Sequence, residues 1–194
     1  MARRPRNTLA DAGPRIDTER LILRRWCQDD LEPFARMNAD PRVMEYFPRT
    51  LTPAESDALA DFVEDHFARR GFGPLAAEIR ETGAFAGFIG LSVPSFEAHF
   101  TPAVEIGWRL AYEYWGQGYA TEGARAVLWL AFGELSLPGI VSFTVPANMR
   151  SRRVMEKLGM TRDPADDFDH PKVMPGHPLR RHVLYRLHAP SLRS

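Results

Sequence analysis

The chain has 194 residues, of which 44% are hydrophobic and 26% are charged, and this suits one soluble domain with a sizeable core. Basic and acidic side chains both total 25, a balance that argues against a general nucleic-acid binder. The single Cys27 rules out an internal disulfide, and the longest apolar runs fall short of the roughly 20 residues of a membrane span. We therefore expect a cytoplasmic protein with neither nucleic acid nor membrane as partner.

The first half of the chain predicts a strand followed by helices. We expect residues 1–16 to form a flexible tail and residues 17–190 to form one domain, because the basic start lacks the apolar stretch of a signal peptide. The pattern predicts a strand at 20–26, a helix at 30–38 and a short helical piece at 43–46. Thr52-Pro53-Ala54-Glu55 is a capping-box start for a further helix that Gly71 ends.

The second half predicts a sheet. Strands are predicted at 72–80, 85–93 and 103–110, and their short connections favour an antiparallel meander. A helix at 121–132, a strand at 139–145 and a helix at 148–159 follow, and this strand–helix–strand order favours local parallel pairing. The remainder predicts a loop at 163–178 and a last strand at 181–187. The expected fold class is therefore a mixed α/β sheet flanked by helices.

A glycine turn, Trp115 to Glu122, connects a predicted strand to a helix. Gly116 and Gly118 allow positive φ, and the first N–H groups of the helix lack internal partners and lie at its positive dipole end. Such a turn suits a phosphate or pyrophosphate, although an ordinary turn capped by Thr121 accounts for the same residues. A P-loop would need Gly-Lys-Ser/Thr, and a dinucleotide fingerprint would lie in the first βαβ unit, so both are disfavoured.

A second segment, Asn148 to Met160, begins with a good helix cap and ends beside Gly159. Together with the glycine turn, it resembles the GNAT superfamily of acetyl-CoA-dependent N-acetyltransferases, most closely the branch with the Rim-type ribosomal-protein N-terminal acetyltransferases. The likeness runs from about Asp17 to Leu187. It rests on residues 18–24, 88–90, 104–108, 114–122 and 148–160.

The resemblance implies a single GNAT-type domain with a mostly antiparallel sheet and one splayed parallel strand pair. It implies acetyl-CoA as co-substrate, with no metal, and pantetheine between the splayed strands. Where the family often has Arg or Gln, this chain has Trp115, which we expect to pack under the loop. The implied cofactor-binding residues are the main chain of Trp108, Leu110, Gln117, Gly118, Tyr119, Ala120 and Thr121, with Asn148 and Ser151 at the thiol end and Arg152 at the 3′-phosphate.

The expected reaction is direct attack of a neutral amine on the thioester, which requires a base and donors for an oxyanion near Trp108. Glu105 is the base candidate, because a carboxylate within an apolar strand has a raised pKa; a one-residue register error would place it in solvent instead. Ser151 is the acid candidate. Tyr112, Tyr114 and Tyr119 are alternatives.

The acceptor stays open between a protein N-terminus and a small-molecule amine, and a homodimer is a family-level expectation. We expect residues 43–67, 94–102 and 163–178 to form the acceptor pocket. A non-catalytic CoA sensor and a small nucleotide-phosphate binder are the alternative functions. One polar cluster could attract a cationic amine or bind a metal, although its irregular spacing favours solvated surface: Asp166, Asp167, Asp169, His170, His177 and His182.

Overall fold

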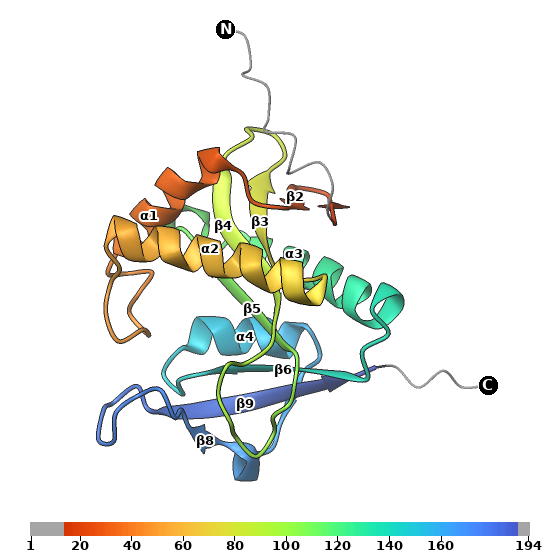
Figure 1. Ribbon diagram of the computed structural model, residues 1–194. Coiled ribbons are helices and arrows are strands. Elements are labelled where there is room, and N and C mark those ends of the chain that lie inside the picture. The colour runs from red at the N-terminus through yellow and green to blue at the C-terminus, as the bar shows by residue number, and fades with distance from the viewer. Residues whose placement is uncertain (1–13, 190–194) are drawn as a thin grey trace, which may run out of the picture.

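A nine-stranded sheet forms the centre of the protein, in a computed structural model that describes residues 14–189 (Figure 1). The strand order is β1-β2-β3-β4-β5-β6-β9-β7, and β8 pairs with β9. The strands are β1 (Ile16–Asp17), β2 (Leu21–Arg24), β3 (Pro74–Ile79), β4 (Phe85–Ser92), β5 (Glu105–Leu110), β6 (Gly139–Thr144), β7 (Thr161–Arg162), β8 (Phe168–Asp169) and β9 (Arg181–His188).

The pairing of β5 with β6 differs from that of every other neighbouring pair in this sheet. It is parallel, whereas the other pairs are antiparallel, and it has one register pair, Glu105 with Val141. The backbone N–H of Val141 donates to the carbonyl of Val104 at 2.9 Å. By contrast, β4 with β5 and β6 with β9 each continue through six register pairs. The two strands thus meet at one end and separate, which confirms the predicted mixed sheet with a splayed pair.

Helices cover both faces of the β2–β5 part of the sheet (Figure 1). These helices are α1 (Leu31–Ala39), α2 (Pro53–Arg70) and α3 (Tyr119–Trp129), whereas α4 (Met149–Lys157) lies beside β6. Phe34 of α1 packs on Phe88 of β4, with ring centroids 6.2 Å apart, while Gly123 of α3 lies against Ile89. Because adjacent strand residues point to opposite faces, α1 and α3 must lie on opposite sides of β4.

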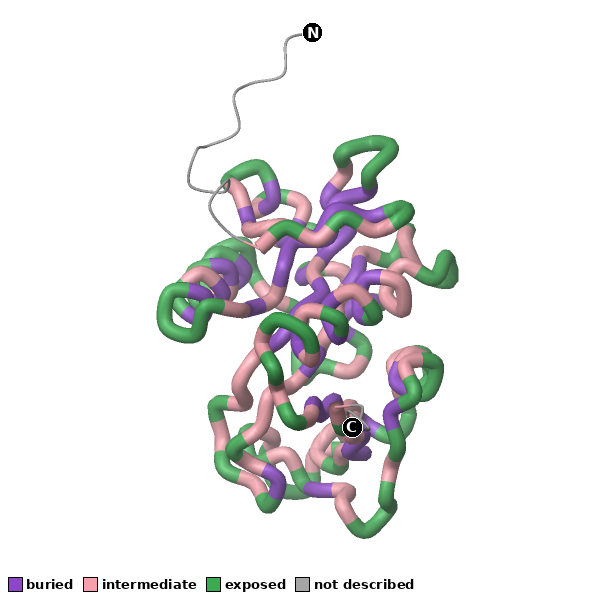
Figure 2. Tube along the Cα trace, turned by 90° about the vertical axis from the view of Figure 1, so that its right-hand side faces the viewer, coloured by how far each residue is buried: buried purple, intermediate pink, exposed green. Residues whose placement is uncertain are grey.

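Two hydrophobic clusters form the core, and Figure 2 shows the buried residues concentrated in the central strands. The larger cluster includes Ile140 of β6 and Met155 of α4. The smaller one includes Val141 and Phe168. Since Ile140 and Val141 alternate across β6, the two clusters lie on opposite faces of that strand.

The N-terminus of α2 has the predicted capping box. Glu55 N–H donates to Thr52 Oγ1 at 3.3 Å, Thr52 N–H donates to the Glu55 carboxylate at 2.9 Å, and Gly71 ends the helix at φ 76°. We expect Thr52→Ala to lower the free energy of unfolding by about 1 kcal/mol, because one helix N–H loses its acceptor. Urea denaturation measures this. Thr50→Ala, an exposed threonine outside the cap, is the control, and an equal loss in both variants would contradict the assignment.

Three predicted segments are corrected by the structure. Residues 43–46 form turns and not a helix, with the N–H groups of Val43 and Met44 both bonded to the carbonyl of Asp40. The expected loop at 163–178 contains β8, which pairs with β9 and buries Phe168. The expected tail at 1–16 ends sooner, because Ile16 already pairs within the sheet; residues 1–13, and residue 190 of the expected domain, lie outside the described part. No helix within residues 14–189 has the length and apolar character needed to cross a membrane.

Candidate active site

A cavity of about 870 Å³ lies beside the splayed strands. One end, which we call the α1–α2 half, is lined by those helices, the 43–48 segment, β4 and β5. The other end, the α4 half, is lined by the glycine turn, the end of β6 and α4. The α1–α2 half is lined by Phe34, Val43, Phe47, Leu59, Phe62, Val63, Phe88, Ser92, Glu105, Gly107 and Arg109. The α4 half is lined by Tyr114, Gly116, Gly118, Tyr119, Ala120, Thr121, Thr144, Asn148, Arg150, Ser151, Arg153 and Lys157.

The glycine turn presents a run of unbonded amides at this cavity. Gly116 and Gly118 have φ angles of 75° and 87°, which only glycine adopts without strain. Across the described part of the chain, the backbone N–H groups from Gly116 to Thr121 have no hydrogen-bond acceptor; the helical ladder begins with Glu122 N–H donating to Gly118 at 3.0 Å. The turn therefore has the free donors and the positive helix end that suit a phosphate.

Two side-chain contacts hold this turn in place. The Trp115 indole N–H donates to the carbonyl of Leu110 at 2.8 Å, so Trp115 packs under the loop and ties it to the end of β5. Arg20 donates to the carbonyl of Gln117 at 2.9 Å and to the Glu122 carboxylate at 2.7 Å. This role of Arg20 and Glu122 could not be predicted from a local pattern, because the two residues are about a hundred positions apart in the chain and meet only in the fold.

Glu122 is a fixed anion within this network. Its carboxylate also accepts from Thr18 Oγ1 at 2.6 Å and from the backbone N–H of Arg20 at 2.8 Å. Burial alone would raise the pKa of Glu122, but the hydrogen bonds from Thr18 and Arg20 outweigh it and hold that pKa below its ordinary value. The ionised carboxylate thus fastens the turn to the start of β2.

The backbone of β5 faces the gap between the splayed strands. Ala111 N–H points to β4, where it donates to Ala86, and the Val104 carbonyl points to β6. Because these directions alternate along a strand, the N–H and C=O groups of Trp108 point into the gap. Leu110 points the same way, but its carbonyl already accepts from Trp115, so it can offer a ligand its N–H alone.

The start of α4 brings two of its predicted residues to the cavity. Asn148 is the helix cap: its Oδ1 accepts from Ser151 N–H at 3.2 Å and its Nδ2 donates to Thr144 Oγ1 at 3.0 Å. Both ends of that side chain are therefore occupied. Ser151 lines the cavity, and its hydroxyl makes no hydrogen bond with any residue between 14 and 189. Of the two, Ser151 is free to act on a ligand.

Arg152 does not reach the cavity. Its guanidinium donates to the Pro146 carbonyl at 3.1 Å and to Tyr185 Oη at 3.3 Å. Other basic side chains line the cavity instead. Arg150, Arg153 and Lys157 do so from one face of α4. Their spacing of three and four residues is the helical repeat, and this signal could have identified them from the sequence.

Glu105 lies in the α1–α2 half of the cavity, whereas its neighbour Ile106 is fully buried on the other face of β5. Among the described residues its carboxylate has one hydrogen-bond partner, Ser92 Oγ at 3.4 Å. Burial raises the pKa of Glu105 to about 8, against a small opposing effect of Ser92. A carboxyl group that titrates near neutral pH inside a cavity is well suited to proton transfer.

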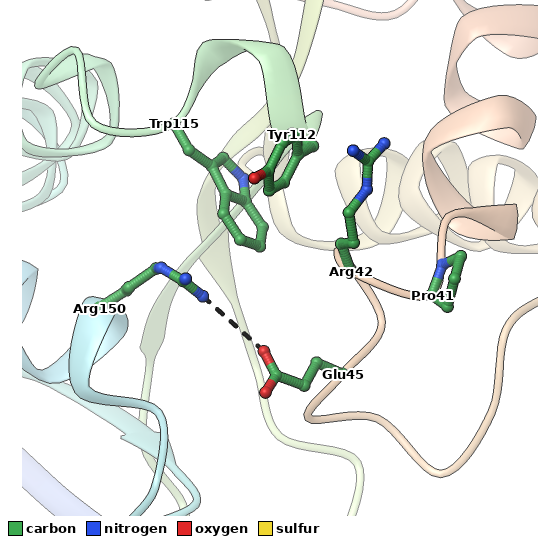
Figure 3. A pocket seen from close by; sticks show the side chains of 6 residues that line it. All are labelled: Pro41, Arg42, Glu45, Tyr112, Trp115 and Arg150. Atoms are coloured by element: carbon green, nitrogen blue, oxygen red, sulfur yellow. Dashed lines mark ion pairs between the residues drawn. The ribbon is translucent and has the colours of Figure 1, made fainter.

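A side pocket of about 390 Å³ adjoins the glycine turn (Figure 3). Arg150 stacks on Trp115 at 4.8 Å and forms an ion pair with Glu45 at 3.7 Å, while Arg42 stacks on Tyr112 at 3.9 Å. Tyr112, one of the alternative acids, therefore lies in this side pocket, whereas Tyr114 and Tyr119 line the main cavity. These contacts join the 41–45 segment, the glycine turn and α4 beside the cavity.

The acidic and histidine cluster is only in part the solvated surface we expected: Asp169 is exposed, whereas His170 and His182 are half-buried. Asp166, Asp167 and Asp169 form ion pairs with Arg186, Arg162 and Arg180, respectively. Two of the histidines, His170 and His182, pack among aromatic rings at the cavity, with their own rings 5.0 Å apart. Burial lowers the pKa of His170 to about 4 and also lowers the pKa of His182. Within residues 14–189, no group of three His, Cys, Asp or Glu residues is placed to hold a metal.

Comparison with known proteins identifies the family. Residues 20–161 match the model of the acetyltransferase (GNAT) domain. The chain belongs to the GNAT acetyltransferase family. This GNAT acetyltransferase is 34% identical over 157 residues to the FsC-acetyl coenzyme A-N(2)-transacetylase of Aspergillus fumigatus, with 77% of this chain and 66% of that protein covered.

Solved structures agree with this fold. The acetyltransferase from Agrobacterium tumefaciens str. C58 is 32% identical, has a TM-score of 0.72 and covers 90% of this GNAT acetyltransferase and 94% of its own chain. RimJ of Mycobacterium smegmatis, solved in complex with CoA-disulfide, has a TM-score of 0.73 over 95% of this chain and 92% of its own, at 18% identity. The likeness to that Rim-type enzyme is therefore one of fold.

Proposed function

We propose that this GNAT acetyltransferase transfers acetyl from acetyl-CoA to a primary amine by direct attack within a ternary complex. The observation that supports the donor most directly is the run of unbonded amides from Gly116 to Thr121 beside the gap between β5 and β6. In this proposal the amides hold the pyrophosphate, and the Trp108 carbonyl and the Leu110 N–H, which both point into the gap, bind the pantetheine arm. The name of the Aspergillus relative includes the same donor.

The cationic face of α4 supports a phosphate-bearing donor. Arg153 and Lys157 line the α4 half of the cavity and are exposed. Exposed cations that face a cavity attract multiply charged anions and help to bind them. In our proposal these two side chains, rather than Arg152, meet the outlying phosphates of CoA. The amides and the cations lie in the same half, so the reacting end of the donor would point towards β5.

In this proposal, Glu105, Ser151 and Trp108 carry out the proton transfers and bind the oxyanion. Glu105 takes the proton from the acceptor ammonium, directly or through water, and its raised pKa matches that task. The N–H of Trp108 donates to the oxyanion that forms when the amine attacks. The hydroxyl of Ser151 lies in the α4 half; as the tetrahedral intermediate collapses, it gives its proton to the departing thiolate and regains one from the nitrogen that becomes the amide. Tyr114 is the alternative donor.

The decisive experiment couples a binding measurement with turnover. We expect CoA at millimolar concentration to raise the melting temperature by several degrees, and acetyl-CoA with a suitable amine to release free thiol. ADP, which has the diphosphate but no pantetheine, is the control. Stabilisation without thiol release over a broad panel of peptides and amines would instead support a non-catalytic CoA sensor. Equal stabilisation by ADP and CoA would support a nucleotide-phosphate binder.

A further inference from the structure

Arg109 is a cation in the α1–α2 half of the cavity without an anionic partner. It lies on β5, and among the described residues it forms no ion pair; the one carboxylate that shares its cavity lining is Glu105, four residues away in the same strand. Its Nη1 donates to Asn38 Oδ1 at 2.6 Å, while its Nε is buried with no acceptor. A partly buried cation without a counter-charge is also costly, so this arrangement favours an anionic partner from outside the chain.

The surroundings of Arg109, which is half-buried, hold the guanidinium in place and shield part of it from solvent. The guanidinium stacks between Phe47 at 4.2 Å and Phe88 at 5.4 Å. Asn38, which accepts from it, is itself fixed by a 2.8 Å hydrogen bond to Ser56. Burial lowers the pKa of Arg109 to about 10, which leaves the side chain cationic at neutral pH. A fixed, poorly hydrated guanidinium binds a carboxylate more strongly than an exposed one does.

We propose that the acceptor amine carries a carboxylate, and that Arg109 binds this carboxylate while Glu105 faces the amine. Nη1 is bonded to Asn38 and Nε is buried, so Nη2 is the part of the guanidinium that can donate to a carboxylate oxygen. The inference rests on the proposed transfer to a primary amine, and it adds the chemical class of the acceptor.

The spacing along β5 sets the shape of that acceptor. Glu105 and Arg109 point to the same face, and four residues of strand separate their Cα atoms by about 13 Å. Gly107 lies between them without a side chain, and the same half of the cavity is lined by the apolar Val43, Phe47 and Val63. The acceptor is therefore an extended molecule with its amine at one end, its carboxylate at the other and an apolar body between.

Matched substrate pairs test this inference. We would measure kcat/KM for straight-chain ω-amino acids from β-alanine to 6-aminohexanoate, each against its own carboxamide, with acetyl-CoA saturating. We expect the wild type to prefer the carboxylate by about 10- to 100-fold at one or more chain lengths, as for a charge-assisted hydrogen bond. We expect Arg109→Gln to bring this ratio near one and Arg109→Lys to retain part of it.

The ratio separates binding from a structural role, because a general disturbance of the fold would lower both rates together. A wild-type ratio near one over the whole series, with transfer to amines intact, would overturn the inference and leave the proposed function standing. If no member of the series is acetylated, thermal stabilisation in the presence of CoA decides: carboxylate-specific stabilisation that Arg109→Gln removes supports the inference, and equal effects of acid and amide overturn it.

Discussion

Glu105→Gln should lower kcat/KM by about 10²- to 10⁴-fold, the usual contribution of a general base. The amide keeps the size of the side chain and its contact with Ser92, but it cannot take a proton from the acceptor. Steady-state thiol release at fixed amine concentration measures the effect. Glu81→Gln, at an exposed turn outside the cavity, is the matched control and should retain wild-type activity. A variant at Glu105 that stays within threefold of wild type would remove this residue from the proposed mechanism.

The pH dependence of kcat/KM is a second test of the role of Glu105. With a pKa of about 8, Glu105 is increasingly protonated as pH falls below 8, so wild-type kcat/KM should fall about tenfold per pH unit in addition to the titration of the amine itself. In Glu105→Gln the first contribution should vanish and that of the amine should persist. An unchanged pH profile in the variant would assign the titration to another group.

The stability contributed by Glu105 should change with pH in the opposite direction to activity. The pKa of Glu105 is raised from 4.5 to about 8 on folding, so between these values the folded protein binds more protons than the unfolded chain. Its contribution to stability is therefore full below about pH 4.5 and is lost as pH rises to 8. Above pH 8, Glu105→Gln should melt at a higher temperature than wild type. This result would also show that lost activity does not reflect lost folding.

Gly118→Glu should weaken CoA binding by about 100-fold, or about 2.7 kcal/mol. The new side chain would begin 3.3 Å from Arg20 Nη2, within the turn that we propose as the pyrophosphate site, and its negative charge there would repel the phosphates. Isothermal titration with CoA measures the dissociation constant.

The matched control is Gly83→Glu in the turn between β3 and β4. Both glycines have positive φ, 87° for Gly118 and 72° for Gly83, and at Gly83 an added Cβ meets nothing within 4 Å. Each variant should therefore lose about 1–2 kcal/mol of stability from the left-handed backbone, and we expect CoA affinity to fall in Gly118→Glu alone. Equal affinities in the two variants would place the diphosphate elsewhere.

Local patterns in the sequence predicted much of the fold because their causes are local. The capping box at Thr52 and the left-handed Gly71 define α2 without any tertiary contact, and alternation in β5 placed Glu105 and Ile106 on opposite faces. The segment at 43–46 failed for the reverse reason. Its N–H groups make single turns on Asp40 that do not propagate into a helix, and Val43 and Met44 are buried by contacts with the rest of the fold rather than by helical periodicity.

In the candidate site, too, the features with local causes could be predicted from the sequence and those with tertiary causes could not. The glycine turn could be found from the sequence, because two glycines before a helix have a direct meaning for the backbone. The choice of Arg152 over Arg153 depended on the rotation of α4, which the spacing from Arg150 to Lys157 would have fixed. The sequence could not show that Arg109 lacks an anionic partner, because this depends on where the fold places every carboxylate of the chain.

The single junction between β5 and β6 has a mechanical consequence. Each half of the sheet has its own ladder of six register pairs, and one pair at Val141 joins the halves. A small rotation of one half against the other would strain that junction and leave both ladders intact. The width of the opening is therefore maintained by side-chain packing across the two halves, to which Ile140 and Met155 of the larger cluster contribute, rather than by backbone hydrogen bonds.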